Sequence, residues 1–164
     1  MERDSWYDVA EVCLNGHVSN ANSQRYPAHN KKFCSECGKP TTTRCSGCNM
    51  PIRGEFHVSG AVMVSHFTPP AFCHECGKPY SWTQERIRVA DQLTDEAENL
   101  DEKEKEALKD TFADLVHQSP RTTLAASRFK RLAKKAGDAI TDGLRAILVE
   151  VACEAAKRQL WPVP

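Results

Sequence analysis

The chain has 164 residues, of which 40% are hydrophobic, 27% charged and 7% aromatic, values typical of a globular protein with a modest core. This length suits one ordinary domain or two very small ones. Lys and Arg together number 22, as do Asp and Glu, so the net charge is zero. That balance excludes a uniformly basic protein that coats nucleic acid, and it excludes an acidic disordered chain.

No apolar run reaches the ~18 residues of a membrane-spanning helix, so we expect no transmembrane segment. The first residues, Met1 to Ser5, lack the basic and apolar regions of a signal peptide. Both observations lead us to expect a cytoplasmic protein. In that compartment, eight cysteines that include three Cys-x-x-Cys pairs indicate metal binding rather than disulfides.

Charge and proline content divide the chain near Pro79 to Ser81. Residues 1–80 carry a net charge of +1, residues 81–118 of −6 and residues 119–164 of +5. Six of the nine prolines lie in the first 80 residues, whereas long proline-free segments follow. The sequence therefore predicts two domains, at residues 1–80 and 81–164.

The first 80 residues show strand and turn patterns without helical periodicity. Residues 7–13 are rich in β-branched and aromatic side chains, which predicts a strand. Residues 53–58 and 61–64 flank Ser59 and Gly60, which predicts a hairpin. Apolar residues are too few here for a conventional core, so another interaction must stabilise this domain.

Helical periodicity begins after residue 80. Ile87, Ala90 and Leu93 recur at helical spacing and predict a first helix. Asp101 followed by Glu104 is a capping-box pattern that predicts the start of a second helix, which ends before Pro120. The apolar face of this second helix comprises Leu108, Phe112 and Leu115.

A third helix is predicted to begin near Thr122 or Thr123 and to end at Gly137. Its apolar residues are Leu124, Phe129, Leu132 and Ala136. A fourth is predicted over residues 138–160, unless the third and fourth form one kinked helix. Its apolar stripe is Ile140, Leu144, Ile147, Leu148, Val151 and Ala155. The predicted fold class is α+β: a small β-rich double zinc-ribbon domain followed by an all-α region of three to four helices.

Four pairs of candidate metal ligands follow one another along the first domain. Three are Cys-x-x-Cys turns, whose backbone amides can hydrogen-bond thiolates, and the first pair is Cys13 with His17. Zinc takes four such ligands in a tetrahedron, so eight ligands predict two Zn²⁺ per chain. The predicted ligands are Cys13, His17, Cys34, Cys37, Cys45, Cys48, Cys73 and Cys76.

Two pairing schemes are compatible with this order. Sequential pairing joins the first pair to the second and the third to the fourth, so that the second site is a Cys₄ zinc ribbon. A cross-brace, as in RING-type domains, joins the first pair to the third and the second to the fourth. Cross-braced domains usually separate the second and third pairs by only a few residues. Because residues 39–44 intervene here, we favour sequential pairing.

Other candidate residues have simpler interpretations. His57, His66 and His74 are expected to be hydrogen-bonded or exposed rather than metal ligands. Cys153 lies beside the apolar stripe of the last helix and is expected to be a buried, inert thiol. The eight ligands fill two tetrahedra and leave no open position for water, and no Walker A, dinucleotide-binding or His-Glu-x-x-His motif occurs. We therefore expect that the protein is not an enzyme.

A basic segment from Arg121 to Lys135 contains no acidic residue. Its cations are Arg121, Arg128, Lys130, Arg131, Lys134 and Lys135. On a helix several of them share one face, which can bind the phosphates of nucleic acid. The simpler interpretation is a solvated face, or one that packs against the acidic residues of segment 95–114.

Several stretches of the sequence resemble a family of uncharacterised bacterial proteins, catalogued as a domain of unknown function. They include Cys13 to His17, residues 25–27 and 30–38, residues 51–54, residues 69–80 and residues 120–132. The resemblance covers nearly the whole chain. It implies a bacterial cytosolic protein with zinc-ribbon knuckles and a helical tail, and it implies no activity.

The sequence thus predicts a non-catalytic zinc-binding interaction or adaptor protein with two structural zinc sites. We expect a protein partner, or self-association through the apolar stripe of the C-terminal helices. The alternative is a nucleic-acid-binding protein that uses the basic helix over residues 121–135.

Overall fold

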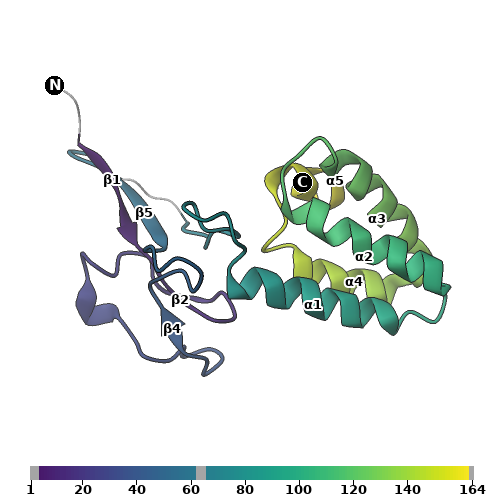
Figure 1. Ribbon diagram of the computed structural model, residues 1–164, viewed down its shortest axis with the longest axis horizontal. Helices are drawn as coiled ribbons and strands as arrows, with labels where there is room; N and C mark the ends of the chain where they lie inside the picture. The colour runs from purple at the N-terminus through teal and green to yellow at the C-terminus, as the bar shows by residue number, and fades with distance from the viewer. Residues whose placement is uncertain (1–3, 62–65, 163–164) are drawn as a thin grey trace. The chain divides into compact units, whose positions relative to one another are not determined.

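The computed structural model describes residues 4–61 and 66–162. The chain divides into two compact units, Met1–Thr83 (unit 1) and Gln84–Pro164 (unit 2). Short strands and turns make up unit 1, whereas helices make up unit 2 (Figure 1). The predicted α+β class is therefore confirmed. The predicted domains, 1–80 and 81–164, stay a prediction that the chelation experiment below tests.

Unit 1 contains two small antiparallel sheets. A two-stranded ribbon pairs β1 (Ser5–Val9) with β5 (Arg53–Val58), which lie side by side in Figure 1. A three-stranded sheet has the order β3 (Val18–Asn20), β2 (Glu11–Cys13), β4 (Thr41–Thr42). A short 3₁₀ helix, η1, spans Pro27–His29. The strand predicted over residues 7–13 is thus split between β1 and β2 at Ala10, whose amide donates to the Ile52 carbonyl (2.9 Å).

The predicted hairpin over residues 53–64 lies only partly within the described residues. The chain turns at Ser59 and Gly60, where Gly60 has a φ of +74° and the Ala61 amide donates to the Val58 carbonyl (3.2 Å). However, β5 pairs with β1, and residues 62–64 lie outside the described residues. Gly54 permits this pairing, since a Cβ atom there would lie 2.2 Å from the Ala21 carbonyl oxygen.

Buried carboxylates and amides order the long loop that follows β3. Asp8 is buried, and its carboxylate accepts hydrogen bonds from the amides of Gln24 (3.1 Å) and Arg25 (3.2 Å). The Asn20 side chain donates to the Tyr26 carbonyl (2.9 Å) and to Asn30 Oδ1 (2.7 Å). Polar contacts therefore order this loop where apolar contacts are few.

Unit 2 has five helices in its described residues, where three or four were predicted. They are α1 (Ser81–Asp95), α2 (Glu102–Val116), α3 (Thr122–Ala136), α4 (Asp138–Leu148) and α5 (Glu154–Leu160). The predicted capping box is present at Asp101 and Glu104. Gly137, with a φ of +104°, separates α3 from α4 and excludes one kinked helix. The predicted fourth helix is interrupted after Leu148 and resumes as α5 beyond Cys153, whose amide donates to the Leu115 carbonyl (2.9 Å).

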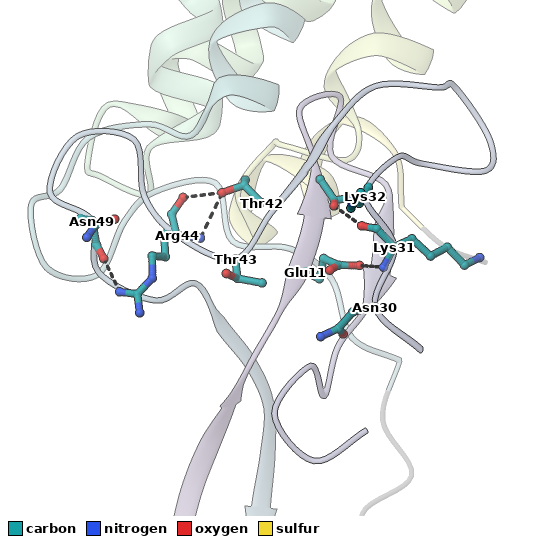
Figure 2. A pocket seen from close by; sticks show the side chains of 9 residues that line it. Glu11, Asn30, Lys31, Lys32, Thr42, Thr43, Arg44 and Asn49 are labelled. Atoms are coloured by element: carbon teal, nitrogen blue, oxygen red, sulfur yellow. Dashed lines mark hydrogen bonds between the residues drawn. The ribbon is translucent and has the colours of Figure 1, made fainter. Parts of the chain in front are cut away.

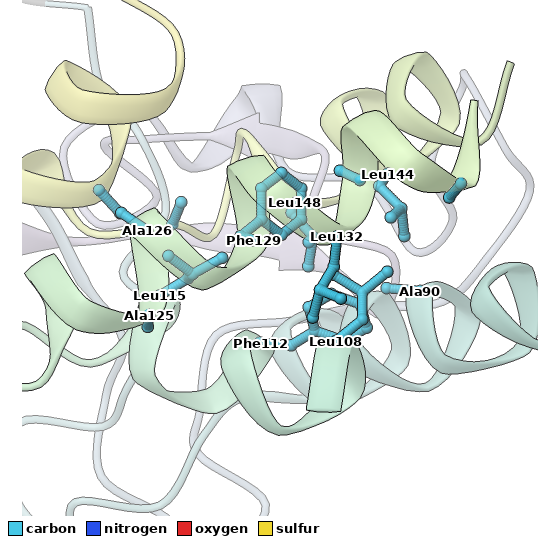
Figure 3. Packing of buried hydrophobic residues seen from close by; sticks show 14 of the residues in the cluster. Ala90, Leu108, Phe112, Leu115, Ala125, Ala126, Phe129, Leu132, Leu144 and Leu148 are labelled. Carbon is cyan, nitrogen blue, oxygen red and sulfur yellow. The ribbon is translucent and has the colours of Figure 1, made fainter. Parts of the chain in front are cut away.

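The helices of unit 2 bury one apolar cluster of sixteen residues. Figure 3 shows Leu108, Phe112 and Leu132 pointing toward one another within it. Leu144 and Leu148 of the predicted C-terminal stripe are fully buried, and Ile140 and Ile147 pack partly buried against the same cluster. The stripe is thus largely used inside unit 2, which removes the main argument for self-association through it.

Leu124 is an exception to the predicted apolar face of α3. Its side chain is 48% exposed, whereas Ala125, Phe129 and Leu132 are buried. The buried positions of α3 recur at steps of three and four residues, and Leu124 lies five residues before Phe129 and therefore off this face.

Two matched substitutions on α3 test this assignment of the core. Leu132→Ala should lower the free energy of unfolding of unit 2 by about 2–5 kcal/mol, because it opens a cavity in the cluster. Leu124→Ala should change it by less than about 0.5 kcal/mol, since that side chain is largely exposed. Urea unfolding followed by helical circular dichroism measures both. Equal losses for the two variants would contradict the assignment.

Candidate metal centres

Three eight-residue turns in unit 1 repeat one backbone arrangement. They occupy residues 33–40, 44–51 and 72–79, and each carries a Cys-x-x-Cys pair with a proline three residues later. In each turn the residue before the first cysteine forms an isolated antiparallel bridge with that proline. The amide of the first cysteine also donates to the carbonyl before the proline, at 2.8–2.9 Å. We call these three turns the knuckles.

A residue in the left-handed conformation follows the second cysteine of each knuckle. Gly38 and Gly77 have a φ of +69°, and Asn49 has a φ of +64°. This conformation costs glycine little and is tolerated by asparagine, which explains these residue types. It lets the amides of Gly38, Asn49 and Gly77 donate back to the first cysteine's carbonyl, at 2.9–3.0 Å.

Amides inside the knuckles also point at sulfur. The amides of Glu36, Gly47 and Glu75 lie 3.4, 3.3 and 3.5 Å from the Sγ atom of the first cysteine of their knuckle. Such donors stabilise a thiolate over a thiol. The backbone is therefore arranged for charged sulfur at all three knuckles.

The first ligand pair uses a longer turn. The Cys13 amide donates to the His17 carbonyl (2.9 Å), and the Gly16 amide donates to the Cys13 carbonyl (2.9 Å). The His17 amide lies 3.3 Å from Cys13 Sγ, which repeats the amide-to-sulfur contact of the knuckles. This turn directs the imidazole of His17 to the same point as the Cys13 sulfur.

The structure brings the eight predicted ligands together in two groups. Cys13, His17, Cys34 and Cys37 form one (site 1), and Cys45, Cys48, Cys73 and Cys76 form the other (site 2). In each group the four ligand atoms lie within 4.8 Å of one another, so each can hold a metal ion. The grouping is sequential and not cross-braced.

Distances between ligand atoms match a tetrahedral metal and no disulfide. Sulfur atoms at the corners of a tetrahedron with Zn–S bonds of about 2.3 Å lie about 3.8 Å apart, against about 2.05 Å in a disulfide. The Sγ atoms of Cys13 and Cys37 lie 3.7 Å apart, and those of Cys45 and Cys76 lie 3.8 Å apart. Those of Cys48 and Cys73 lie 3.7 Å apart.

Site 1 identifies which nitrogen of His17 faces the metal position. Nδ1 lies 3.6 Å from the sulfur of Cys13 and 3.6 Å from that of Cys34, as a shared corner of the tetrahedron requires. Nε2 points the other way, 3.9 Å from a carboxylate oxygen of Glu36. A carboxylate beyond the distal nitrogen is a frequent outer partner of a metal-binding histidine.

Backbone amides and burial set the acidity of the thiols. The Lys39 amide lowers the pKa of Cys37 to about 7, and the Cys76 amide lowers the pKa of Cys73 to about 6. Burial raises the pKa of Cys13 to about 11. Thiolates gathered this closely repel one another, and a divalent cation removes that repulsion.

Tyr80 provides a further observation at site 2. Its hydroxyl is the one buried side-chain polar atom without a hydrogen-bond partner in the described part of the chain. Burial, and then the charges of Cys73 and Cys45, raise the pKa of this hydroxyl. It is a donor close to the cluster, and a metal-bound thiolate is an acceptor that it can use. The donor set and its surroundings therefore fit a thiolate-bound metal.

The remaining candidate residues lie outside these groups. His57 Nε2 lies 2.6 Å from Asn22 Oδ1, and the ring stacks on Trp6. His66 and His74 are exposed. Cys153, predicted as a buried thiol, is partly buried against the helical core. The amide donors are as the Cys-x-x-Cys turns predicted, whereas Tyr80 and Glu36 were missed from sequence, since their roles depend on geometry that the ligand spacing does not reveal.

The cations of α3 are all exposed, and two of the six pair with α2. Arg121 Nε lies 3.0 Å from an oxygen of Asp114, and Lys135 pairs with Glu104. Within the described residues, Arg128, Lys130, Arg131 and Lys134 have no acidic oxygen within 4.0 Å. Ion pairs with α2 therefore involve Arg121 and Lys135 at the two ends of the basic segment, whereas the cations between them are exposed to solvent.

None of the described helices has the length and apolar character that crossing a bilayer requires. No curated protein and no solved structure matches the chain. A family described as "Uncharacterized protein conserved in bacteria (DUF2321)" matches residues 6–160. The match covers nearly the whole chain, so the protein belongs to this family.

Proposed function

We propose that the chain is a non-catalytic zinc protein, in which two structural Zn²⁺ ions hold unit 1 folded as an interaction or adaptor module. One observation carries the proposal: the ligand atoms of both groups are spaced as the corners of a zinc tetrahedron. Donor chemistry supports zinc, because three or four thiolates with at most one imidazole are typical of structural zinc sites.

Closed coordination argues for a structural role and against catalysis. A catalytic zinc keeps a position for water or substrate, whereas each of these groups supplies four protein ligands. The first residue of every pair is buried as well: Cys13, Cys34, Cys45 and Cys73. Four ligands with half of them buried leave no room for a reacting molecule at the metal.

The composition of the unit 1 core supports a folding role for the metal. Nine apolar residues are buried in the described part of unit 1, and four of these are cysteines of the two sites. The others are Ala10, Val12, Ile52, Tyr80 and Trp82. Five such side chains bury too little apolar surface to offset the conformational entropy of about 80 residues, so metal binding must supply much of the folding free energy.

Exposed apolar side chains support a contact surface in unit 1. Six of the seven large hydrophobic residues that are exposed in the described chain belong to it, and Leu124 is the seventh. The six are Trp6, Tyr7, Leu14, Tyr26, Phe33 and Met50. Aromatic residues and methionine are enriched in protein interfaces. A protein partner that docks on unit 1 therefore fits better than self-association through the C-terminal helices.

Nucleic-acid binding is the alternative function, and the four unpaired cations in the middle of α3 favour it. Arg128, Arg131 and Lys134 follow one another at three-residue steps, with Lys130 beside them. A row of this kind can follow a phosphate backbone, and binding would then depend strongly on salt.

The first prediction concerns metal content and chelation. Protein purified without added metal should contain about two zinc ions per chain by elemental analysis. A chelator should unfold residues 1–80 and leave most helical circular dichroism, because the sixteen-residue cluster of unit 2 contains none of the ligands. Limited proteolysis should then cut unit 1 and spare α2 to α4. Loss of the helical signal together with the zinc would show instead that the two units unfold cooperatively.

A second prediction separates the two sites. Cys45→Ser should remove the zinc of site 2 and leave about one ion per chain, and Cys34→Ser should do the same to site 1. Cys153→Ser is the matched control and should retain both ions, since Cys153 belongs to neither group. The assignment of Cys34 and Cys45 to different sites is wrong if a chain with both Cys34→Ser and Cys45→Ser still binds one ion at full occupancy.

A third prediction tests the alternative function. If α3 binds nucleic acid, changing Lys130, Arg131 and Lys134 to Gln should reduce the slope of log affinity against log salt by about 3. Lys103→Gln on α2 is the control and should leave the slope unchanged. Fluorescence anisotropy with a labelled duplex and a labelled single strand measures this effect. Absence of binding by the unmodified chain at low salt would exclude the alternative.

A further inference from the structure

A polar pocket in unit 1 lies apart from the ligand atoms of both metal sites. Its volume is about 630 Å³, within the usual range of ligand pockets. Figure 2 shows Arg44 and Asn49 on one side, Lys31, Lys32 and Asn30 on the other, and two threonines between them. The threonines, Thr42 and Thr43, come from β4 and the residue that follows it.

Positive charge exceeds negative charge in this pocket. Three of its lining residues are cations, and Glu11 is its one acidic residue. Glu11 is buried, and its Oε1 accepts a hydrogen bond from the Lys31 amide (2.8 Å). Within the described residues, Lys31, Lys32 and Arg44 have no carboxylate oxygen within 4.0 Å. Lys32 and Arg44 are therefore available to an anion in the pocket, whereas the Lys31 side chain extends away from it (Figure 2), with its Nζ 3.5 Å from Ser35 Oγ.

Hydrogen bonds fix the Arg44 side chain and the backbone at Lys31 and Lys32. The Arg44 guanidinium donates to the Asn49 carbonyl (2.9 Å), and the Arg44 amide donates to Thr42 Oγ1 (3.1 Å). On the other side, the Thr41 amide donates to the Lys32 carbonyl (3.1 Å), and the Thr41 hydroxyl donates to the Lys31 carbonyl. An arginine fixed in this way presents a planar set of donors that suits a phosphate group.

A second pocket adjoins the first and is more apolar. It has a volume of about 250 Å³ and shares Thr42, Arg44 and Asn49 with the polar pocket. Leu14 is the exposed apolar part of its lining and covers Tyr80 and Trp82, which are buried and whose rings stack with centroids 4.5 Å apart. A ligand anchored at Arg44 can therefore extend an apolar, planar group over this wall.

We infer that the two pockets form one binding site for a nucleotide, with its phosphate held between Lys32 and Arg44 and its base against Leu14. This site goes beyond the structural zinc function and uses no residue of the basic segment on α3. The nucleotide can be free or part of a strand, since both present the same phosphate and base.

Calorimetric titration of the zinc-loaded full chain tests the site with three probes: inorganic phosphate, adenosine 5′-monophosphate and a short single-stranded oligonucleotide. The mononucleotide should bind more tightly than phosphate. Lys32→Gln and Arg44→Gln should each weaken mononucleotide binding about tenfold, as the loss of a hydrogen bond to a charged group does. Glu11→Gln should strengthen it, because that variant keeps the acceptor oxygen for Lys31 and removes the negative charge.

Controls separate this site from nonspecific attraction and from misfolding. Lys39→Gln makes the same change of charge outside the pocket and should leave the affinity unchanged, with two zinc ions retained in every variant. Leu14→Ala should weaken binding of the mononucleotide and leave binding of phosphate unchanged. If only the oligonucleotide binds, the ligand of this site is a nucleotide within a nucleic-acid strand rather than a free nucleotide. The inference is overturned if no probe binds, if Lys39→Gln weakens binding as much as Lys32→Gln, or if phosphate binds as tightly as the mononucleotide.

Discussion

Repulsion between gathered thiolates is the constraint on which unit 1 depends. Each site places four ligand atoms within 4.8 Å of one another, and at least three are sulfur. Amide donors and burial act in opposite directions on these thiols. The Cys76 amide lowers the pKa of Cys73 to about 6, whereas burial raises the pKa of Cys13 to about 11. A divalent cation at the centre of such a group would offset the repulsion, because it attracts and stabilises every thiolate at once. Strands of two to six residues can then persist with few apolar contacts.

The repeated knuckle extends this constraint beyond the ligands. In each repeat, one left-handed residue and one bridge to proline fix the residues that flank the cysteines. Two of these flanks carry the cations of the polar pocket: Lys31 and Lys32 precede the knuckle at 33–40, and Arg44 begins the next. The geometry that holds sulfur therefore also positions charge at the surface.

Local patterns in the sequence predicted the features that depend on local chemistry. The eight ligands come together as their spacing indicated, and the capping box at Asp101 begins α2 as predicted. Long-range contacts set the features that the sequence did not predict. β5 pairs with β1 some fifty residues earlier. The break after Leu148 has no glycine or proline, and a long-range hydrogen bond from the Cys153 amide to the Leu115 carbonyl follows it. Leu124 shows that an apolar residue near a helical face need not belong to it.

The two metal sites are coupled to the polar pocket through the backbone. Asn49, whose carbonyl holds the Arg44 guanidinium, follows directly after Cys48 of site 2. Lys31 and Lys32 are held by Thr41, which lies on the far flank of the knuckle that carries Cys34 and Cys37 of site 1. Each wall of the pocket thus adjoins a different candidate metal site, so we expect the loss of one ion to disturb one wall. A ligand that requires both walls would bind the fully metallated chain preferentially, and by linkage it would raise the apparent affinity of unit 1 for both ions.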